Sequence, residues 1–370
     1  MREGRQVKTE LRTATRLFAI DNLRIVLTAL VVIHHVAVTY GNIPLWYYTE
    51  PAKDPSGVAL DILVVFNQAF FMGFFFLISG FFTPGSYDRK GGRAFLRDRL
   101  IRLGIPLLVF LLVLRPLVTL GSYKSGYGSL PYWQYYIGSW DPGPMWFAEV
   151  LIVFAALYAL WRRFRAPAEA AVGARDSVLQ VRWIVLFTVG LAVATTLWRI
   201  PVPVGSYVPV LGLPTPYFLP QYAAMFVVGL IAFRRGWFQT LPAKAGLLGL
   251  ISAGLVTVVL LPLGQLTTGL LSTAVTATWE SAFAVSLIIG LTVLFRERFN
   301  HQGPRGKWLS AQAFTVYIIH PLVLVPISYA LAGLHAIAVV KFAVVVVIAL
   351  PACWGLAYLV RSLPGAKRVL

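Results

Sequence analysis

Ten apolar stretches dominate this chain, and a helix needs about 20 apolar residues to cross the hydrocarbon core of a bilayer. The stretch at 218–233 is short, and flanking residues are expected to extend it. The sequence therefore predicts an all-α fold, a polytopic transmembrane helical bundle of about ten helices. The predicted spans are 18–40, 59–82, 102–120, 144–161, 182–200, 218–233, 244–262, 272–294, 309–331 and 336–360.

The composition excludes a soluble globule. Hydrophobic residues make up 58% of the chain and charged residues 12%, and the mean hydropathy is +0.75. A soluble domain carries about 25% charged residues, so this chain has too little polar surface to cover one. We expect a short tail at 1–17, a single transmembrane domain at 18–360 and a second tail at 361–370.

The basic residues predict the orientation of the bundle. The net charge of +18 raises the possibility of nucleic-acid binding, but Lys and Arg occur in short runs between the apolar stretches. If the N-terminus is inside, 26 of the 32 Lys and Arg residues fall in inside segments, and the outside loops hold Lys53, Lys124 and Arg199. This bias predicts cytoplasmic termini in an inner cell membrane, with no nucleic-acid partner.

The first apolar run is not expected to be a cleaved signal peptide. It is 23 residues long, includes Asp21, Asn22 and Arg24, and ends without a small-residue cleavage site. A metal site is not expected either. Cys353 is the single cysteine, and the adjacent residues His34 and His35 cannot share a helix face.

Ionisable side chains inside a bilayer are costly, so each is a functional candidate. Asp61 stands at the start of its span, where capping of the helix is the simpler explanation. The candidates are Asp21, Arg24, His34, His35, Asp61, Glu149, Glu280 and His320.

Arg24 and His35 are eleven residues apart, so their side chains are expected on one face of the first helix, about 16 Å apart along its axis. This arrangement indicates a polar lane through the bundle. The alternative is that Arg24 reaches the inner headgroups and His35 packs as a satisfied core residue.

Other spans place polar groups at a similar depth. Glu149 is expected near His35, where a carboxylate can orient an imidazole and raise its basicity. His320 precedes Pro321, which is expected to loosen its helix. Glu280 enters from the outside on another span. For each of these residues, a hydrogen bond that only joins two helices is the alternative.

The predicted inside loop at 83–102 contains four arginines in a segment that is expected to be helical. They suit phosphate binding, because guanidinium groups are planar and always charged. Inside-positive topology and contact with anionic lipids explain the same residues. The arginines are Arg93, Arg97, Arg99 and Arg102. The outer loops are rich in Trp and Tyr, which is typical of an interfacial belt; a sugar-stacking surface is the alternative.

Several of these segments resemble the acyltransferase-3 family of multi-pass membrane acyltransferases, most closely its members similar to glucan biosynthesis protein C. The family signature is an Arg, ten residues and a His, which matches Arg24 and His35 without a gap. Further matching segments occur in order along the chain, at 18–24, 77–82, 102–106, 145–149, 221–222, 226–229 and 317–321.

The resemblance implies transfer of an acyl group, often acetyl, from cytoplasmic acyl-CoA to an extracytoplasmic carbohydrate hydroxyl or natural-product acceptor. His35 is then the expected general base, with Arg24 and Glu149 beside it, and the four loop arginines bind the CoA phosphates. A variant has His35 carry the acyl group covalently. Further substrate-binding residues are expected to be Asp21, Asn22, Ser79, Trp146, Glu280 and His320. A donor such as Ser79, Trp146 or His320 is expected to stabilise the developing oxyanion.

Two other classes of function remain open at this stage. A transporter or flippase for a lipid-linked glycan also needs intramembrane charge, but the chain lacks the matched inverted repeats typical of such proteins. A lipid- or sterol-binding protein is the other alternative. Membrane lipids are expected partners, and a homodimer is left open.

Overall fold

The computed structural model describes residues 17–43, 45–164, 179–208 and 212–370. Within these residues it is helical, with an isolated bridge between Val208 and Leu213 in place of any sheet. Ten helical spans are long and apolar enough to cross a membrane, which confirms the predicted fold class. Most of the predicted N-terminal tail and of the predicted basic loop at 162–182 lies outside the described residues.

The helices follow the predicted apolar stretches closely. Eight of the spans are formed mainly by one helix each, and the third and fourth are composite. The principal helices are α2 (Phe18–Tyr40), α3 (Gly57–Lys90), α8 (Trp146–Arg163), α9 (Val181–Trp198), α10 (Leu219–Arg235), α12 (Ala243–Leu266), α13 (Gly269–Arg298), α14 (Pro304–Ala330) and α15 (Ala338–Ser362). Short helices include α7 (Tyr132–Gly138) before α8 and α11 (Trp237–Thr240) after α10.

The predicted inside loop at 83–102 is almost entirely helical, as expected for its arginine segment but not for residues 83–90. Helix α3 continues to Lys90, α4 (Gly92–Arg99) begins two residues later, and Gly91 between them has a φ of 74°. Arg and Lys are good helix formers, so a run of positive charge indicates exposure to water but not a break in the helix. The break occurs at Gly91 because glycine tolerates a positive φ.

The third span, Gly92–Tyr127, alternates between α-helix and π-helix. Two π-helical segments, η1 (Leu100–Gly104) and η2 (Phe110–Leu114), directly precede the helical turns that contain Pro106 and Pro116. Proline has no N–H and clashes with the carbonyl four residues earlier, so the helix widens there. The span continues through α5 (Ile105–Val109), α6 (Arg115–Ser122) and η3 (Tyr123–Tyr127).

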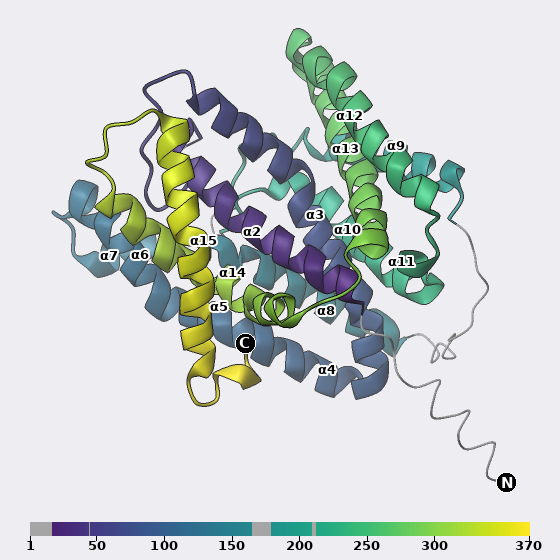
Figure 1. Ribbon diagram of the computed structural model, residues 1–370, viewed down its shortest axis with the longest axis horizontal. Helices are drawn as coiled ribbons and strands as arrows, with labels where there is room; N and C mark the ends of the chain where they lie inside the picture. Colours follow the sequence, from purple (N-terminus) through teal and green to yellow (C-terminus); the bar gives the residue numbers. More distant parts are fainter. Residues whose placement is uncertain (1–16, 44, 165–178, 209–211) are drawn as a thin grey trace.

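Helix α2 lies in the middle of the bundle, in contact with α3, α13, α14 and α15 (Figure 1). The paired helices α12 and α13 form one side of the molecule with α9. We call the end of the bundle where α3, α8, α10 and α13 finish in arginine or lysine the basic face. Helix α2 begins at this face and ends at the opposite face, because its first turns bond to residues 299–302 beyond α13.

Helices α3 and α10 cross at unusually short range through Gly80 and Gly229. A Cβ atom added at Gly80 would lie 2.1 Å from the carbonyl oxygen of Phe226, and one at Gly229 would lie 2.2 Å from that of Leu77. Small residues allow backbones in a membrane to approach in this way, and dispersion contacts then hold the helices together.

We expect Gly80→Ala or Gly229→Ala to destabilise the protein by about 2 kcal/mol, because each added methyl overlaps a backbone atom. Thermal unfolding in detergent measures this effect. Gly254→Ala in α12 is the matched control, because a Cβ there meets nothing within 4 Å. Equal unfolding temperatures for Gly80→Ala and Gly254→Ala would show that the crossing is not close-packed.

Candidate active site

Two histidines from different helices lie together near the opposite face. His35 stands five residues before the end of α2, and His320 is fully buried in α14. Their ring centroids are 4.9 Å apart. His34, the neighbour of His35, faces Phe71 with ring centroids 5.1 Å apart. The structure thus brings the predicted residues His35 and His320 into one cluster.

Each imidazole of this pair is held by a backbone carbonyl. His35 Nδ1 lies 2.8 Å from the carbonyl oxygen of Val31, and His320 Nδ1 lies 2.7 Å from that of Tyr317. A carbonyl oxygen only accepts hydrogen bonds, so Nδ1 is the protonated nitrogen in both rings. In the neutral rings Nε2 therefore carries the lone pair and is the basic atom.

Pro321 explains why the carbonyl of Tyr317 is available to His320. In a regular helix this oxygen would accept a hydrogen bond from the N–H of residue 321. Proline has no N–H, so the oxygen is left to the side chain of His320. The Tyr317 hydroxyl also donates to the carbonyl of Pro144, which ties α14 to the start of α8.

Trp46 covers the two imidazoles from the opposite face. Its ring centroid lies 4.0 Å from that of His35 and 5.8 Å from that of His320, and it stacks on the latter ring at 9°. Trp46 belongs to the segment 41–56 between α2 and α3, which we call the cover loop. The sequence indicated an aromatic belt for Trp46 and not this contact, because pairing between a loop and a distant helix leaves no local pattern.

Three ring nitrogens in this cluster are buried without a hydrogen-bond partner in the described part of the chain: His34 Nδ1, His320 Nε2 and Trp46 Nε1. Such atoms cost about 1–3 kcal/mol each, so a protein rarely keeps several together without a use for them. One donor, Trp46 Nε1–H, and one acceptor, His320 Nε2, are thus available to a substrate.

The cover loop is pinned to several helices. Lys341 of α15 forms an ion pair with Glu50, and the carboxylate of Asp54 accepts a hydrogen bond of 2.9 Å from the N–H of Ala338. Asp61 accepts hydrogen bonds from the backbone and side chain of Asn42, each 2.7 Å long. Asp61 therefore anchors the loop, in agreement with a structural role.

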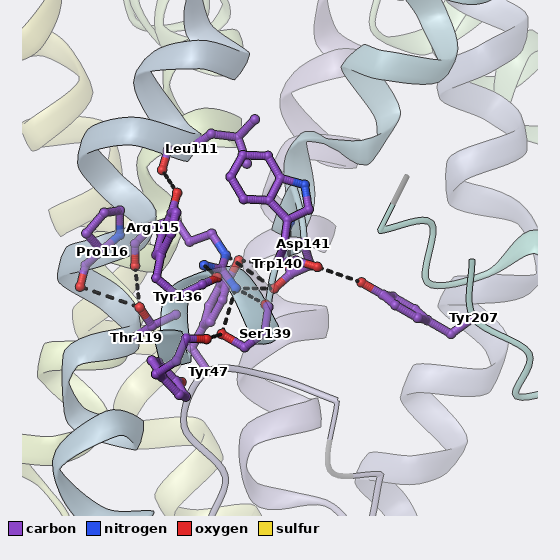
Figure 2. A network of polar contacts seen from close by, with 12 residues as sticks. Tyr47, Leu111, Arg115, Pro116, Thr119, Tyr136, Ser139, Trp140, Asp141 and Tyr207 are labelled. Atoms are coloured by element: carbon purple, nitrogen blue, oxygen red, sulfur yellow. Dashed lines mark hydrogen bonds and ion pairs between the residues drawn. The ribbon is translucent and has the colours of Figure 1, made fainter. Parts of the chain in front are cut away.

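Arg115 organises the protein around the cover loop (Figure 2). Its side chain is 1% exposed, lies 3.1 Å from the Asp141 carboxylate and donates to the carbonyl oxygen of Ser139. Asp141 also accepts hydrogen bonds from the Gly143 N–H at 2.6 Å and the Tyr47 hydroxyl at 3.5 Å. Burial, followed by the nearby charge of Asp141, raises the pKa of Tyr47 well above its usual value, so Tyr47 remains a donor.

Arg115 has no role among the sequence-based predictions, although an arginine inside an apolar stretch is itself a signal of a buried polar network. Its partners Ser139 and Asp141 come from the segment 139–142, which has no helical pattern of its own, and Tyr136 at the end of α7 adds a ring contact. Only the folded chain brings them together.

Glu149 lies in the first turn of α8 and forms no hydrogen bond or ion pair with His35 among the described residues. Its charge acts on Tyr207. Burial, Asp141 and Glu149 raise the pKa of Tyr207 above its usual value, and the nearby charge of Arg115 offsets part of this rise. Glu149 therefore lies beside the Arg115 network. It was expected to orient the imidazole of His35, whose Nδ1 is instead bonded to the carbonyl oxygen of Val31.

Glu280 forms a buried ion pair with Arg199, with 2.5 Å between Glu280 Oε2 and Arg199 Nη2. Arg199 also lies over the rings of Tyr217 and Phe218, 5.6 and 5.1 Å from their centroids. The pair joins α13 to the end of α9. This contact supports the helix-joining alternative for Glu280.

The predicted residues at the start of α2 lie at the basic face, away from the histidines along the helix. Asp21 forms an ion pair of 3.7 Å with Arg24. Asn22 donates hydrogen bonds to the carbonyl oxygens of Phe299 and His301, at 2.6 and 3.0 Å. Asn22 thus fastens the connection between α13 and α14, and the catalytic role of Arg24 stays a prediction.

The remaining predicted residues belong to two other regions. Trp146 packs in an aromatic group with Phe76 and Tyr222, and Ser79 is half-buried in α3. The four arginines predicted to bind CoA lie at the basic face on α4 and η1: Arg93, Arg97, Arg99 and Arg102. Three of them are exposed, and Arg99 lies over the Phe95 ring at 5.3 Å.

Comparison with known families supplies a match over most of the chain. A family model described as an acyltransferase domain, that of the acyltransferase-3 family, matches residues 17–358. No curated protein and no solved structure matches the chain.

We expect Glu280→Gln to destabilise the protein by about 3 kcal/mol, because it leaves the buried Arg199 guanidinium without a counter-charge. The double variant Arg199→Met with Glu280→Leu should recover most of that loss, since no buried charge then remains unpaired. Thermal unfolding in detergent measures both variants.

Glu297→Gln is the control, because Glu297 pairs with Arg296 at an exposed site and should contribute little. A Glu280→Gln protein as stable as the parent, with a raised KM for an acceptor, would instead assign Glu280 to substrate binding.

Proposed function

The chain belongs to the acyltransferase-3 family and is a membrane acyltransferase, and on this premise we propose that it transfers an acyl group, acetyl in the simplest case, from acyl-CoA to a hydroxyl of an extracytoplasmic carbohydrate or related acceptor. The donor approaches from the basic face, which is cytoplasmic under the positive-inside rule. The acceptor approaches from the opposite face.

One observation carries this proposal: the paired imidazoles of His35 and His320 both present a basic Nε2, because both Nδ1 atoms are engaged by carbonyl oxygens. A general base for a hydroxyl needs this arrangement, with one nitrogen fixed and the other directed at the substrate. A lipid flippase has no need of it.

The proposed reaction begins when the acceptor oxygen attacks the thioester carbon while His35 Nε2 takes the hydroxyl proton. The carbonyl oxygen then carries a negative charge. When this intermediate collapses, the carbon–sulfur bond breaks and the imidazolium of His35 returns the proton to the departing thiolate. The products are the acyl ester and free CoA.

The oxyanion of this intermediate requires a hydrogen-bond donor. The neutral ring of His320 is unsuited, because its one N–H already donates to Tyr317. Trp46 is better suited, since its buried Nε1–H has no partner among the described residues and its ring lies on both imidazoles. We assign the donor role to Trp46 Nε1–H in place of Ser79, Trp146 or His320.

We expect His35→Ala to lower kcat by about 10³-fold or more, because the reaction loses its base. Release of free CoA from acetyl-CoA in the presence of membrane glycans measures the rate. His335→Ala is the control, because His335 is an exposed histidine near the opposite face. Near-parental turnover by a folded His35→Ala protein would refute the proposed role.

We expect Trp46→Phe to lower kcat about 10²-fold with little change in KM, because phenylalanine keeps an aromatic ring over the imidazoles and removes the N–H. Trp133→Phe, at an exposed tryptophan of α7, is the matched control. A raised KM with unchanged kcat for Trp46→Phe would assign the ring to acceptor binding and exclude the oxyanion role.

A further inference from the structure

A cavity of about 900 Å³ lies between α3, α8 and α10, separate from the histidine cluster. It is open along one side, where its lining residues Leu157, Trp161 and Val227 are exposed. It follows α10 from Ala223 to Arg235, a rise of about 18 Å at 1.5 Å per residue. Apolar side chains line most of its length, and three arginines line its end at the basic face: Arg162, Arg234 and Arg235. A long, thin ligand with an apolar body and an anionic head matches this lining.

The arginine end of the cavity carries more positive than negative charge. Arg162 and Arg234 share the single carboxylate of Asp88, with N–O distances of 2.9 and 2.7 Å. Arg235 adds a third positive charge, and Nη2 of Arg234 is buried without a partner in the described chain. Guanidinium groups bind phosphate oxygens through paired donors, so this end suits a phosphorylated group.

Contacts within the protein itself fix the position of the Arg162 guanidinium. Its Nη1 donates to the hydroxyl of Tyr158 at 3.0 Å, and its guanidinium lies 5.0 Å from the ring centroid of Tyr87. A preorganised guanidinium loses less conformational entropy on binding than a mobile one.

A continuous series of aromatic rings leads from the deep end of the cavity to the histidines. Phe226 and Phe154 line that end, with ring centroids 5.1 Å apart. The series continues through Phe76, Phe147 and Tyr317 to His320, and the successive centroid distances are 5.5, 4.7, 6.0 and 6.4 Å.

The geometry points to this cavity as the binding site of the acyl-CoA donor, an inference that rests on the proposed function. The CoA phosphates bind at Arg162, Arg234 and Arg235, and the pantetheine arm follows the aromatic rings toward His35. The arginines of α4 are less suited to this role. Arg93 and Arg97 line a separate cavity of about 460 Å³ without any aromatic residue in its lining.

The test compares two pairs of arginines at the same face. Arg234→Gln with Arg235→Gln removes charge from the cavity, and Arg93→Gln with Arg97→Gln is the matched control on α4. Each protein is placed in nanodiscs of phosphatidylcholine alone, and CoA binding is measured by calorimetry beside steady-state transfer from acetyl-CoA. We expect the cavity pair to weaken CoA binding and raise the KM for acetyl-CoA about tenfold or more, with kcat within about twofold. The α4 pair should leave both constants unchanged.

A second variant tests the cavity without changing its charge. Leu230→Trp fills the middle of the cavity, and we expect it to weaken CoA binding by at least the same factor while thermal unfolding shows a folded protein. Loss of CoA affinity in the α4 pair, with none in the cavity variants, would overturn the inference and place the phosphates on α4.

Native mass spectrometry of protein from anionic membranes identifies the competing occupant. If the cavity pair loses bound phosphatidylglycerol while its CoA affinity stays at the parental value, the cavity is a lipid site and the inference is wrong. Failure of the proposed function gives a different result. In that case the parent protein binds CoA at the cavity without transferring an acyl group.

Discussion

Hydrophobic burial alone cannot hold this bundle together, because lipid tails are as apolar as the helices. Close packing and internally satisfied polar groups must supply the specificity. Gly80 and Gly229 bring the backbones of α3 and α10 into contact, while Arg115 with Asp141 and Arg199 with Glu280 tie helices to outer segments. Other buried polar atoms of the described chain also lack a partner, Arg199 Nε and Nη1 among them, and the cluster around His35 differs because three unpaired ring nitrogens lie close together there.

The fold was largely predictable, because the length of an apolar stretch is a local property that the bilayer thickness imposes directly. The helical arginine segment on α4 was predicted, but the continuation of α3 through residues 83–90 was not, because charge marks exposure and not the end of a helix. The π-helical segments before Pro106 and Pro116 were also missed. Proline announces a disturbance in a helix, but whether it produces a kink or a wider turn depends on the neighbouring helices.

The site was predictable only where one helix carries the information. The spacing of Arg24 and His35 identified α2 as a functional helix. His320 was a candidate because an ionisable side chain in an apolar span is costly. The partners of these residues were not predictable, because they belong to other segments. His35 was expected to bond to Glu149, but its Nδ1 bonds to Val31 within the same helix. Trp46 and Arg115 acquire their roles through contacts between a loop and distant helices.

The cover loop and the cavity at the basic face lie at the two ends of the series of aromatic rings that runs from Phe226 to His320. A thioester held near His35 is exposed to hydrolysis if water reaches the same imidazole. Trp46 lies 4.0 Å from His35, and anchors such as Glu50 with Lys341 hold its loop in place. The donor can therefore occupy the site from the basic face while Trp46 still excludes water from the opposite face. A loop anchored in this way keeps the Trp46 ring over the imidazoles, so in one position the tryptophan both excludes water and directs its Nε1–H to the oxyanion.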